Sequence, residues 1–184
     1  MNETDLIKKF RPIFIFSKGE NYYPVNKHFL KDNSSGKTDM ILNQDVFTKT
    51  PYPQEPLYYH KLDEDEDMLA IAYVLIFPYS VGGFLSMNKV IGDILSCVAV
   101  INKKSKTLKE IYFWNGGKKE YKIKTDRPVI FVSANDHRFL KEINEYCKDL
   151  RWEPNMVKDF DLESMKNKKL EGKSFDYFLE VYDL

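Results

Sequence analysis

Two long apolar segments, residues 68–77 and 90–101, constrain the fold of this chain more than any other feature. Both are rich in β-branched residues, the first also contains aromatic residues, and Pro or Gly residues lie at or near their ends. That combination favours strands over helices. We therefore expect both segments to be central strands. The longest apolar run is also too short to cross a bilayer as a helix, which needs about 20 such residues.

Shorter β-prone runs predict further strands at residues 12–16, 40–42, 57–60 and 129–134. Residues 107–114 and 118–123 should form a hairpin, because Asn115-Gly116 can adopt the positive φ angles of a tight primed turn. Asn26 can cap a short helix that continues to about Lys31. The expected architecture is therefore a succession of antiparallel strands.

A change of hydrophobic period after Asn135-Asp136 predicts one late helix, with Asp136 as its N-cap and its end before Pro154. The apolar residues at helical spacing are Phe139, Leu140, Ile143, Tyr146, Cys147 and Leu150. The predicted fold class is mainly β (α+β): an antiparallel β-sandwich-like single domain with a late helix after the last core strand. This domain spans residues 1–184, with a core at about 11–150 and a C-terminal extension at 151–184.

The composition, with 43% apolar and 30% charged residues, is that of a soluble globular domain. Its formal net charge of zero hides an acidic run at residues 63–67 and eight lysines within residues 103–124. These lysines alternate with aromatic residues, and we expect both to share one small surface that meets RNA phosphates or another partner. The predicted contact residues are Lys103, Lys104, Lys106, Tyr112, Trp114, Lys118, Lys119, Tyr121 and Lys122. A solvated hairpin whose aromatic side chains face the core is the alternative.

The last ten residues combine aromatic and acidic side chains. They either dock on the rest of the domain or form a recognition tail that becomes ordered on a partner. The tail residues predicted to contact a partner are Phe175, Tyr177, Phe178 and Tyr182.

The sequence contains no zinc-helix, nucleophile-elbow or phosphate-loop motif. The three histidines, His28, His60 and His137, lack the spacing of a zinc helix, so we expect no metal, no cofactor and no enzymatic activity. Asp93 lies within an apolar strand, where it must find donors or a cation, and a structural hydrogen bond is the preferred interpretation. A degenerate hydrolase that uses Asp93 and His137 would need these two side chains within hydrogen-bond reach.

The two cysteines, Cys97 and Cys147, are too few for a disulfide framework, and each falls in an apolar-periodic segment. We therefore expect buried thiols in a reducing compartment. Charged residues within the first ten positions do not fit a secretory leader. Together these features predict cytoplasmic residence.

Four landmarks, in order, resemble the vacuolar-sorting protein sixty-two family, a β-rich group of proteins. They are Arg11-Pro12-Ile13-Phe14 with Tyr22-Tyr23-Pro24, Ala72-Tyr73 through Phe77-Pro78-Tyr79, Gly92-Asp93, and Arg127-Pro128-Val129-Ile130-Phe131-Val132 leading to His137. That family continues Gly-Asp with Trp-Glu-His, where this chain has Ile94-Leu95-Ser96. The family's Gly-Ser-His is replaced by Asn135-Asp136-His137.

The short length and the heavy use of Lys, Asn, Tyr, Ile and Phe make the chain similar to microsporidian ribosome dormancy factors. This resemblance implies a non-enzymatic protein that occupies the tRNA exit site near the small-subunit head and silences idle ribosomes. Its partners would be rRNA and ribosomal proteins, with no DNA and no transmembrane segment. The alternative is a vacuolar-trafficking adaptor or a peripheral membrane module whose lysines meet anionic lipid.

Overall fold

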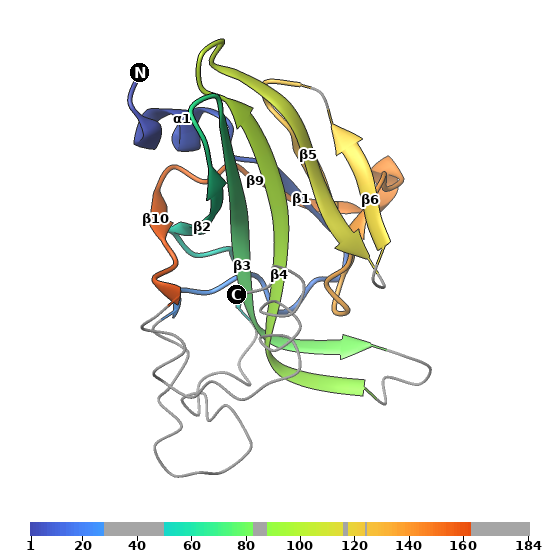
Figure 1. Cartoon of the computed structure of the whole chain (residues 1–184). Coiled ribbons are helices and arrows are strands. Elements are labelled where there is room, and N and C mark those ends of the chain that lie inside the picture. The colour runs from blue at the N-terminus through green and yellow to red at the C-terminus, as the bar shows by residue number, and fades with distance from the viewer. Residues whose placement is uncertain (28–49, 83–87, 116–117, 124, 163–184) are drawn as a thin grey trace.

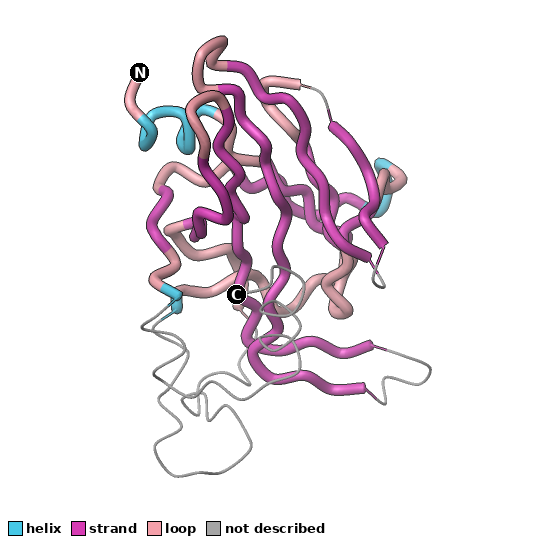
Figure 2. Tube along the Cα trace, in the orientation of Figure 1, coloured by secondary structure: helices cyan, strands magenta, loops and turns pink. Residues whose placement is uncertain are grey.

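Two β-sheets pack on each other around one apolar core, and a short helix packs against that core (Figure 1). The computed structural model describes residues 1–27, 50–82, 88–115, 118–123 and 125–162. Strands make up most of this part of the chain, as Figure 2 shows. The mainly β, sandwich-like fold class is therefore confirmed. The predicted strand at 40–42 and most of the predicted helix from Asn26 to Lys31 lie outside the described residues.

The smaller sheet has the strand order β8-β7-β1-β9. Its strands are β1 (Ile13–Ser17), β7 (Val129–Val132), β8 (Phe139–Leu140) and β9 (Lys148–Trp152). The larger sheet has the order β10-β2-β3-β4-β5-β6. Its strands are β2 (Leu57–Glu64), β3 (Met68–Gly82), β4 (Asn88–Asn102), β5 (Thr107–Asn115), β6 (Lys118–Ile123) and β10 (Val157–Asp159). Each sheet contains one parallel pair, β1 with β7 and β2 with β10, so both sheets are mixed rather than purely antiparallel.

The two long apolar segments form β3 and β4, as predicted, and the predicted hairpin forms β5 and β6. All residues of β3 from Ile71 to Pro78 are buried. A strand covered on both faces needs a continuous apolar run rather than alternation, which is what this segment has. The β3–β4 pairing runs from Met68 opposite Asn102 to Gly82 opposite Asn88.

The C-terminal part of β3 and the N-terminal part of β4 extend beyond the neighbouring strands of the sheet. Pairing of β2 with β3 stops at Val74, and pairing of β5 with β4 begins only at Cys97. From there the two strands continue as a two-stranded ribbon, which Figure 1 shows bending away from the body of the protein.

The predicted late helix after Asn135-Asp136 is wrong. This segment forms β8, a 3₁₀ turn at Glu145–Cys147 and β9 instead. Asn135 and His137 have φ angles of 64° and 46°, which turn the chain away from a helical path. Of the apolar residues that suggested a helix only Phe139 is buried, so they provide no continuous stripe for a core. Within this segment, β9 pairs with β1, which joins the segment to the smaller sheet.

An α-helix lies instead at the other end of the described chain, as α1 (Glu3–Lys9). Asn2 caps it, and Asp5 completes a capping box by accepting a hydrogen bond from the backbone N–H of Asn2. Acidic residues occupy its first turn and basic residues its last turn, which suits the helix dipole. The sequence carries this capping signal, but α1 was not among the predicted elements.

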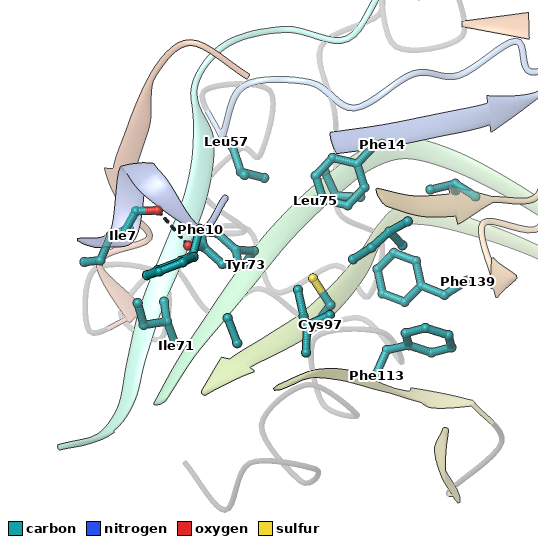
Figure 3. Packing of buried hydrophobic residues seen from close by; sticks show 14 of the residues in the cluster. Ile7, Phe10, Phe14, Leu57, Ile71, Tyr73, Leu75, Cys97, Phe113 and Phe139 are labelled. Carbon is teal, nitrogen blue, oxygen red and sulfur yellow. Dashed lines mark hydrogen bonds between the residues drawn. The ribbon is translucent and has the colours of Figure 1, made fainter. Parts of the chain in front are cut away.

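Aromatic side chains from both sheets interlock in the core (Figure 3). The ring centroids of Phe113 on β5 and Phe139 on β8 lie 4.9 Å apart. The fully buried Tyr73 on β3 donates its hydroxyl hydrogen to the backbone oxygen of Ile7 at 2.7 Å, shown as a dashed line in Figure 3. This hydrogen bond attaches α1 to the centre of the larger sheet.

The Tyr73→Phe substitution should lower the free energy of unfolding by about 1–3 kcal/mol, because it leaves the buried Ile7 carbonyl oxygen without this donor. Urea denaturation measures the change. The matched control is Tyr146→Phe, since Tyr146 is 88% exposed and its substitution should change stability by about 0.5 kcal/mol or less. Equal stability of the two variants would contradict the proposed attachment of α1.

Candidate functional site

A buried imidazole lies between two carboxylates in the interior of the fold. The side chain of His137 has 0% exposed surface. Its Nδ1 is 3.2 Å from Asp93 Oδ2, in hydrogen-bond geometry, and its Nε2 is 3.3 Å from Glu20 Oε2. The second contact is an ion pair without hydrogen-bond alignment, because Nε2 has no hydrogen-bond partner. We refer to Glu20, Asp93 and His137 as the histidine cluster.

The β3–β4 pair positions the imidazole from two directions. Phe77 and Asp93 are opposite one another in this pair. The Phe77 ring stacks on the His137 ring at 3.7 Å between centroids and 14° between planes, while Asp93 bonds the edge of the imidazole. The positive φ angle at His137 belongs to the turn that brings its side chain to these two residues.

Backbone N–H groups hold the Glu20 carboxylate. A turn at Gly19, with φ of 92°, directs the chain from β1 into Glu20. Oε1 of Glu20 accepts hydrogen bonds from the backbone nitrogens of Asn21 at 2.8 Å and Tyr22 at 2.7 Å. Oε2 accepts one from the backbone nitrogen of Asn135 at 2.9 Å. A single carboxylate therefore connects two loops that are distant in the sequence.

The surroundings favour the charged form of both His137 and Glu20. Burial lowers the pKa of His137, but the contacts with Asp93 and Glu20 outweigh it and raise the pKa above its ordinary value of 6.5. Burial raises the pKa of Glu20, but His137 and the backbone donors outweigh it and lower the pKa below its ordinary value of 4.5. The cluster therefore favours an imidazolium between carboxylates.

A cavity of about 370 Å³ opens beside Glu20. Its lining residues come from three separate stretches of chain: Glu20, Asn21, Tyr23, Thr50, Pro51, Tyr52, Asp149 and Leu150. Among the described lining residues there are two acids and no base. The Glu20 side chain has no exposed surface, so the accessible charge is that of Asp149, which favours a neutral or cationic ligand over an anion. Tyr52 is 68% exposed at this site.

Hydrogen bonds order the cavity wall. The Tyr23 hydroxyl donates to Asp149 Oδ2. Burial and the neighbouring Asp149 raise the pKa of Tyr23 well above its ordinary value, so this hydroxyl keeps its hydrogen. Thr50 donates its hydroxyl hydrogen to the Tyr23 carbonyl and its backbone N–H to the Asn21 carbonyl, both at 3.0 Å. The wall is thus a connected set of polar groups.

The lysines predicted to contact RNA lie toward the two ends of β5 rather than on one small surface. Lys103, Lys104 and Lys106 occupy the turn before β5, whereas Lys118 pairs with Asn115 at its far end. Eight residue steps along a strand separate these ends by about 26 Å. The side chains of Trp114, Lys118, Lys119, Tyr121 and Lys122 lie outside the described part, and Tyr112 is half-buried.

The acidic run and the first lysines neutralise each other. Lys103 Nζ lies 3.0 Å from Glu64 Oε1, and Lys104 forms an ion pair with Asp67. Hydrogen bonds from Lys61 and Lys103 lower the pKa of Glu64 to about 2. Lys106 uses its backbone oxygen to accept a hydrogen bond from Lys9. The charge asymmetry seen in the sequence is therefore partly cancelled within the domain.

The structure brings Asp93 and His137 together, as the hydrolase hypothesis required, and it confirms a structural hydrogen bond at Asp93. Sequence analysis did not single out Glu20, Thr50, Tyr52 or Asp149, because no local pattern shows that they meet. Cys97 is buried as expected, whereas Cys147 is exposed. The predicted tail residues Phe175, Tyr177, Phe178 and Tyr182 lie outside the described residues.

Comparisons with known proteins give likenesses in structure alone. No protein-family model and no curated protein matches the sequence. A structure described as "Toxin fold for microbial attack and plant defense" matches with a TM-score of 0.53 and 13% identity, over 89% of this chain and 77% of that one. Necrosis and Ethylene inducing Protein 2, from the causal agent of witches' broom disease of cocoa, matches with a TM-score of 0.51 and 16% identity, over 91% and 77%. NLPPya in complex with mannosamine matches with a TM-score of 0.50 and 16% identity, over 85% and 73%.

These likenesses correct the family and the function expected from the sequence. The fold is similar to that of the necrosis- and ethylene-inducing proteins, so the assignment to the vacuolar-sorting protein sixty-two family is wrong. The inferred microsporidian ribosome dormancy factor is wrong for the same reason, and the trafficking adaptor has no support either. At 13–16% identity the likeness establishes the fold alone.

Among the described residues, no helix is long and apolar enough to cross a membrane. Within the same ranges no group of three or more His, Cys, Asp or Glu side chains is arranged to hold a metal ion.

The histidine cluster should make stability depend on pH in a defined window. Because folding raises its pKa, His137 stabilises the folded protein fully below pH 6.5. This stabilisation is lost as pH rises through the folded pKa of His137. A lowered pKa means that Glu20 contributes fully above pH 4.5, and that this contribution is lost as pH falls through its folded pKa. Urea denaturation should therefore show the full stabilisation by the cluster between pH 4.5 and 6.5.

The variants His137→Gln and His60→Gln separate this effect from general titration. His137→Gln should lose about 3 kcal/mol at pH 5.5, because it leaves buried carboxylate groups without their cation. The stability of His137→Gln should also not decline as pH rises above 6.5, whereas the stability of His60→Gln should still decline. The same slope above pH 6.5 in both variants would rule out His137 as its source.

Proposed function

We propose that this chain is a sugar-binding domain with the toxin fold, and that the cavity beside Glu20 holds an amino sugar without chemical turnover. The observation that carries the proposal is the acidic, hydrogen-bonding cavity with an exposed aromatic ring at Tyr52. Its volume of about 370 Å³ lies within the range of small-ligand sites, roughly 300–1,000 Å³.

The polar groups of the cavity suit a hydroxylated cation. Asp149 is exposed, and the Tyr23 hydroxyl fixes one of its carboxylate oxygens. A carboxylate in such a position can accept hydrogen bonds from sugar hydroxyls or from an ammonium group. The exposed ring of Tyr52 can pack against the apolar face of a sugar or attract an ammonium group.

The comparison with NLPPya supports the class of ligand. That protein was solved in complex with mannosamine, which carries an amine among its hydroxyl groups. An acidic cavity lined by Asn21, Thr50 and Tyr52 fits the same chemistry. The lining and the charge of the cavity belong to this chain's own residues, and they agree with that likeness.

The burial of His137 supports binding rather than hydrolysis. The Asp93–His137 contact provides an acid–base pair, but the imidazole has no exposed surface and no substrate atom can touch it. A general base must come within hydrogen-bond reach of the proton that it removes. The absence of enzymatic activity and the cytoplasmic residence expected from the sequence both stay predictions, and incubation with aryl glycosides of amino sugars would test the first.

Mannosamine and glucosamine should bind with measurable affinity at pH 5.5, and mannose more weakly, because the cavity is acidic. Asp149→Asn should weaken binding of mannosamine at least about tenfold by removing a charged acceptor. Tyr52→Ala should weaken it about fivefold by removing the aromatic face. Titration followed by amide NMR shifts measures each affinity.

Asp159→Asn and Tyr146→Ala serve as matched controls, because both residues are exposed and neither lines the cavity. Both controls should bind mannosamine as the unaltered protein does. If millimolar amino sugar moves no amide resonance of the cavity residues, the proposal is refuted.

A further inference from the structure

We propose that His137 is a positioning residue for the sugar cavity: its protonated ring holds Glu20, and Glu20 holds the cavity wall. Sugar binding would then depend on the protonation of a histidine that never touches the sugar. This inference rests on the function proposed above and adds a mode of regulation to the same site.

Glu20 belongs both to the histidine cluster and to the lining of the cavity. Its carboxylate faces His137, and the residue also lines the cavity. The same carboxylate accepts the backbone hydrogen bonds of Asn21 and Tyr22. The carbonyl of Asn21 in turn accepts the backbone N–H of Thr50, and a β-bridge joins Tyr22 to Thr50. A displaced Glu20 carboxylate therefore releases the wall formed by Asn21 and Thr50.

The number of hydrogens on the imidazole decides whether Glu20 stays in place. An imidazolium has two N–H groups, so its Nδ1–H can donate to Asp93 while the positively charged Nε2–H side of the ring lies 3.3 Å from Glu20 Oε2. A neutral imidazole has a single N–H group, and the hydrogen-bond geometry at Nδ1 assigns it to Asp93. The lone pair of Nε2 then faces Glu20 Oε2 at 3.3 Å. Attraction at this contact becomes repulsion when the proton leaves.

The charged groups around His137 all favour the protonated form of its ring. Glu20 comes from the loop after β1 and Asp93 from β4, and the residue packed from β3, Phe77, is uncharged. Within the turn itself, Asp136 and Arg138 pair with each other at 2.6 Å. Beyond Glu20, Tyr23 and Asp149 form their own hydrogen bond. Among the described residues that face the imidazole, the charges are thus the two carboxylates of the cluster.

The direction of the pH effect follows from these contacts. The wall is held while His137 carries its proton and Glu20 does not, so the hold is lost as pH rises through the raised pKa of His137 in the folded protein or falls through the lowered pKa of Glu20. As pH rises through the pKa of His137, loss of a single proton can weaken sugar binding by up to tenfold per pH unit. The sugar amine also loses its proton at high pH, so the effect of His137 must be measured as a difference between two proteins.

The experiment compares the affinity for mannosamine in the full chain and in its His137→Gln variant at pH 5.5, 6.5, 7.5 and 8.5. The unaltered protein should lose affinity above pH 6.5 more steeply than the variant, because the effect of the ligand amine is common to both. His60→Gln should behave as the unaltered protein does. Identical pH profiles in the unaltered protein and in His137→Gln would overturn the inference.

A second measurement needs no variant and no sugar. In NMR spectra of the free protein, the His137 ring resonances and the amide resonances of Asn21 and Thr50 should titrate with the same midpoint. Amides of Asn21 and Thr50 that stay constant while the ring titrates would overturn the inference, even if His137→Gln does not fold. Failure to bind mannosamine at pH 5.5 would instead refute the proposed function, and the amide titration would still decide whether His137 controls the wall.

Discussion

The antiparallel pairing of β3 with β4 supports almost every other feature of the molecule. Because β3 is buried on both faces, it provides a fixed central layer. Tyr73 on this strand holds α1 through the Ile7 carbonyl, and Phe77 packs on His137. Asp93 enters the histidine cluster from β4, directly across the strand pair from Phe77. The β3–β4 pair therefore positions residues of both the core and the candidate site.

Charges inside an apolar fold need a reason, because an apolar replacement of similar volume is often as stable as a buried ion pair. The histidine cluster joins three stretches of chain that the sheets alone would not connect in this way: the loop at Glu20, strand β4 and the turn at residues 135–137. Its Glu20 end reaches the wall of the acidic cavity. A positioning role for these charges is consistent with where they lie.

The residues that suggested the wrong family still marked the right region. Gly92-Asp93 and His137 were two of its landmarks, and their side chains meet in the cluster. Tyr23, from a third landmark, lines the cavity. Motif residues thus pointed to a site, but four short motifs did not identify the fold. Contact of the lysines with a partner stays a prediction, and residues 63–67 neutralise part of their charge within the fold.

Local sequence by itself determined many of the strands, but not β8, β9 or β10. Runs of β-branched and aromatic residues defined β1, β3, β4 and β7, and Asn115-Gly116 placed the break between β5 and β6, because strand formation and turns depend on near neighbours. Tertiary structure alone decided the parallel pairs, the path after Asn135 and the meeting of Glu20 with His137. These depend on contacts between residues far apart in the chain, and a local hydrophobic period carries no information about which distant backbone or charge will complete them.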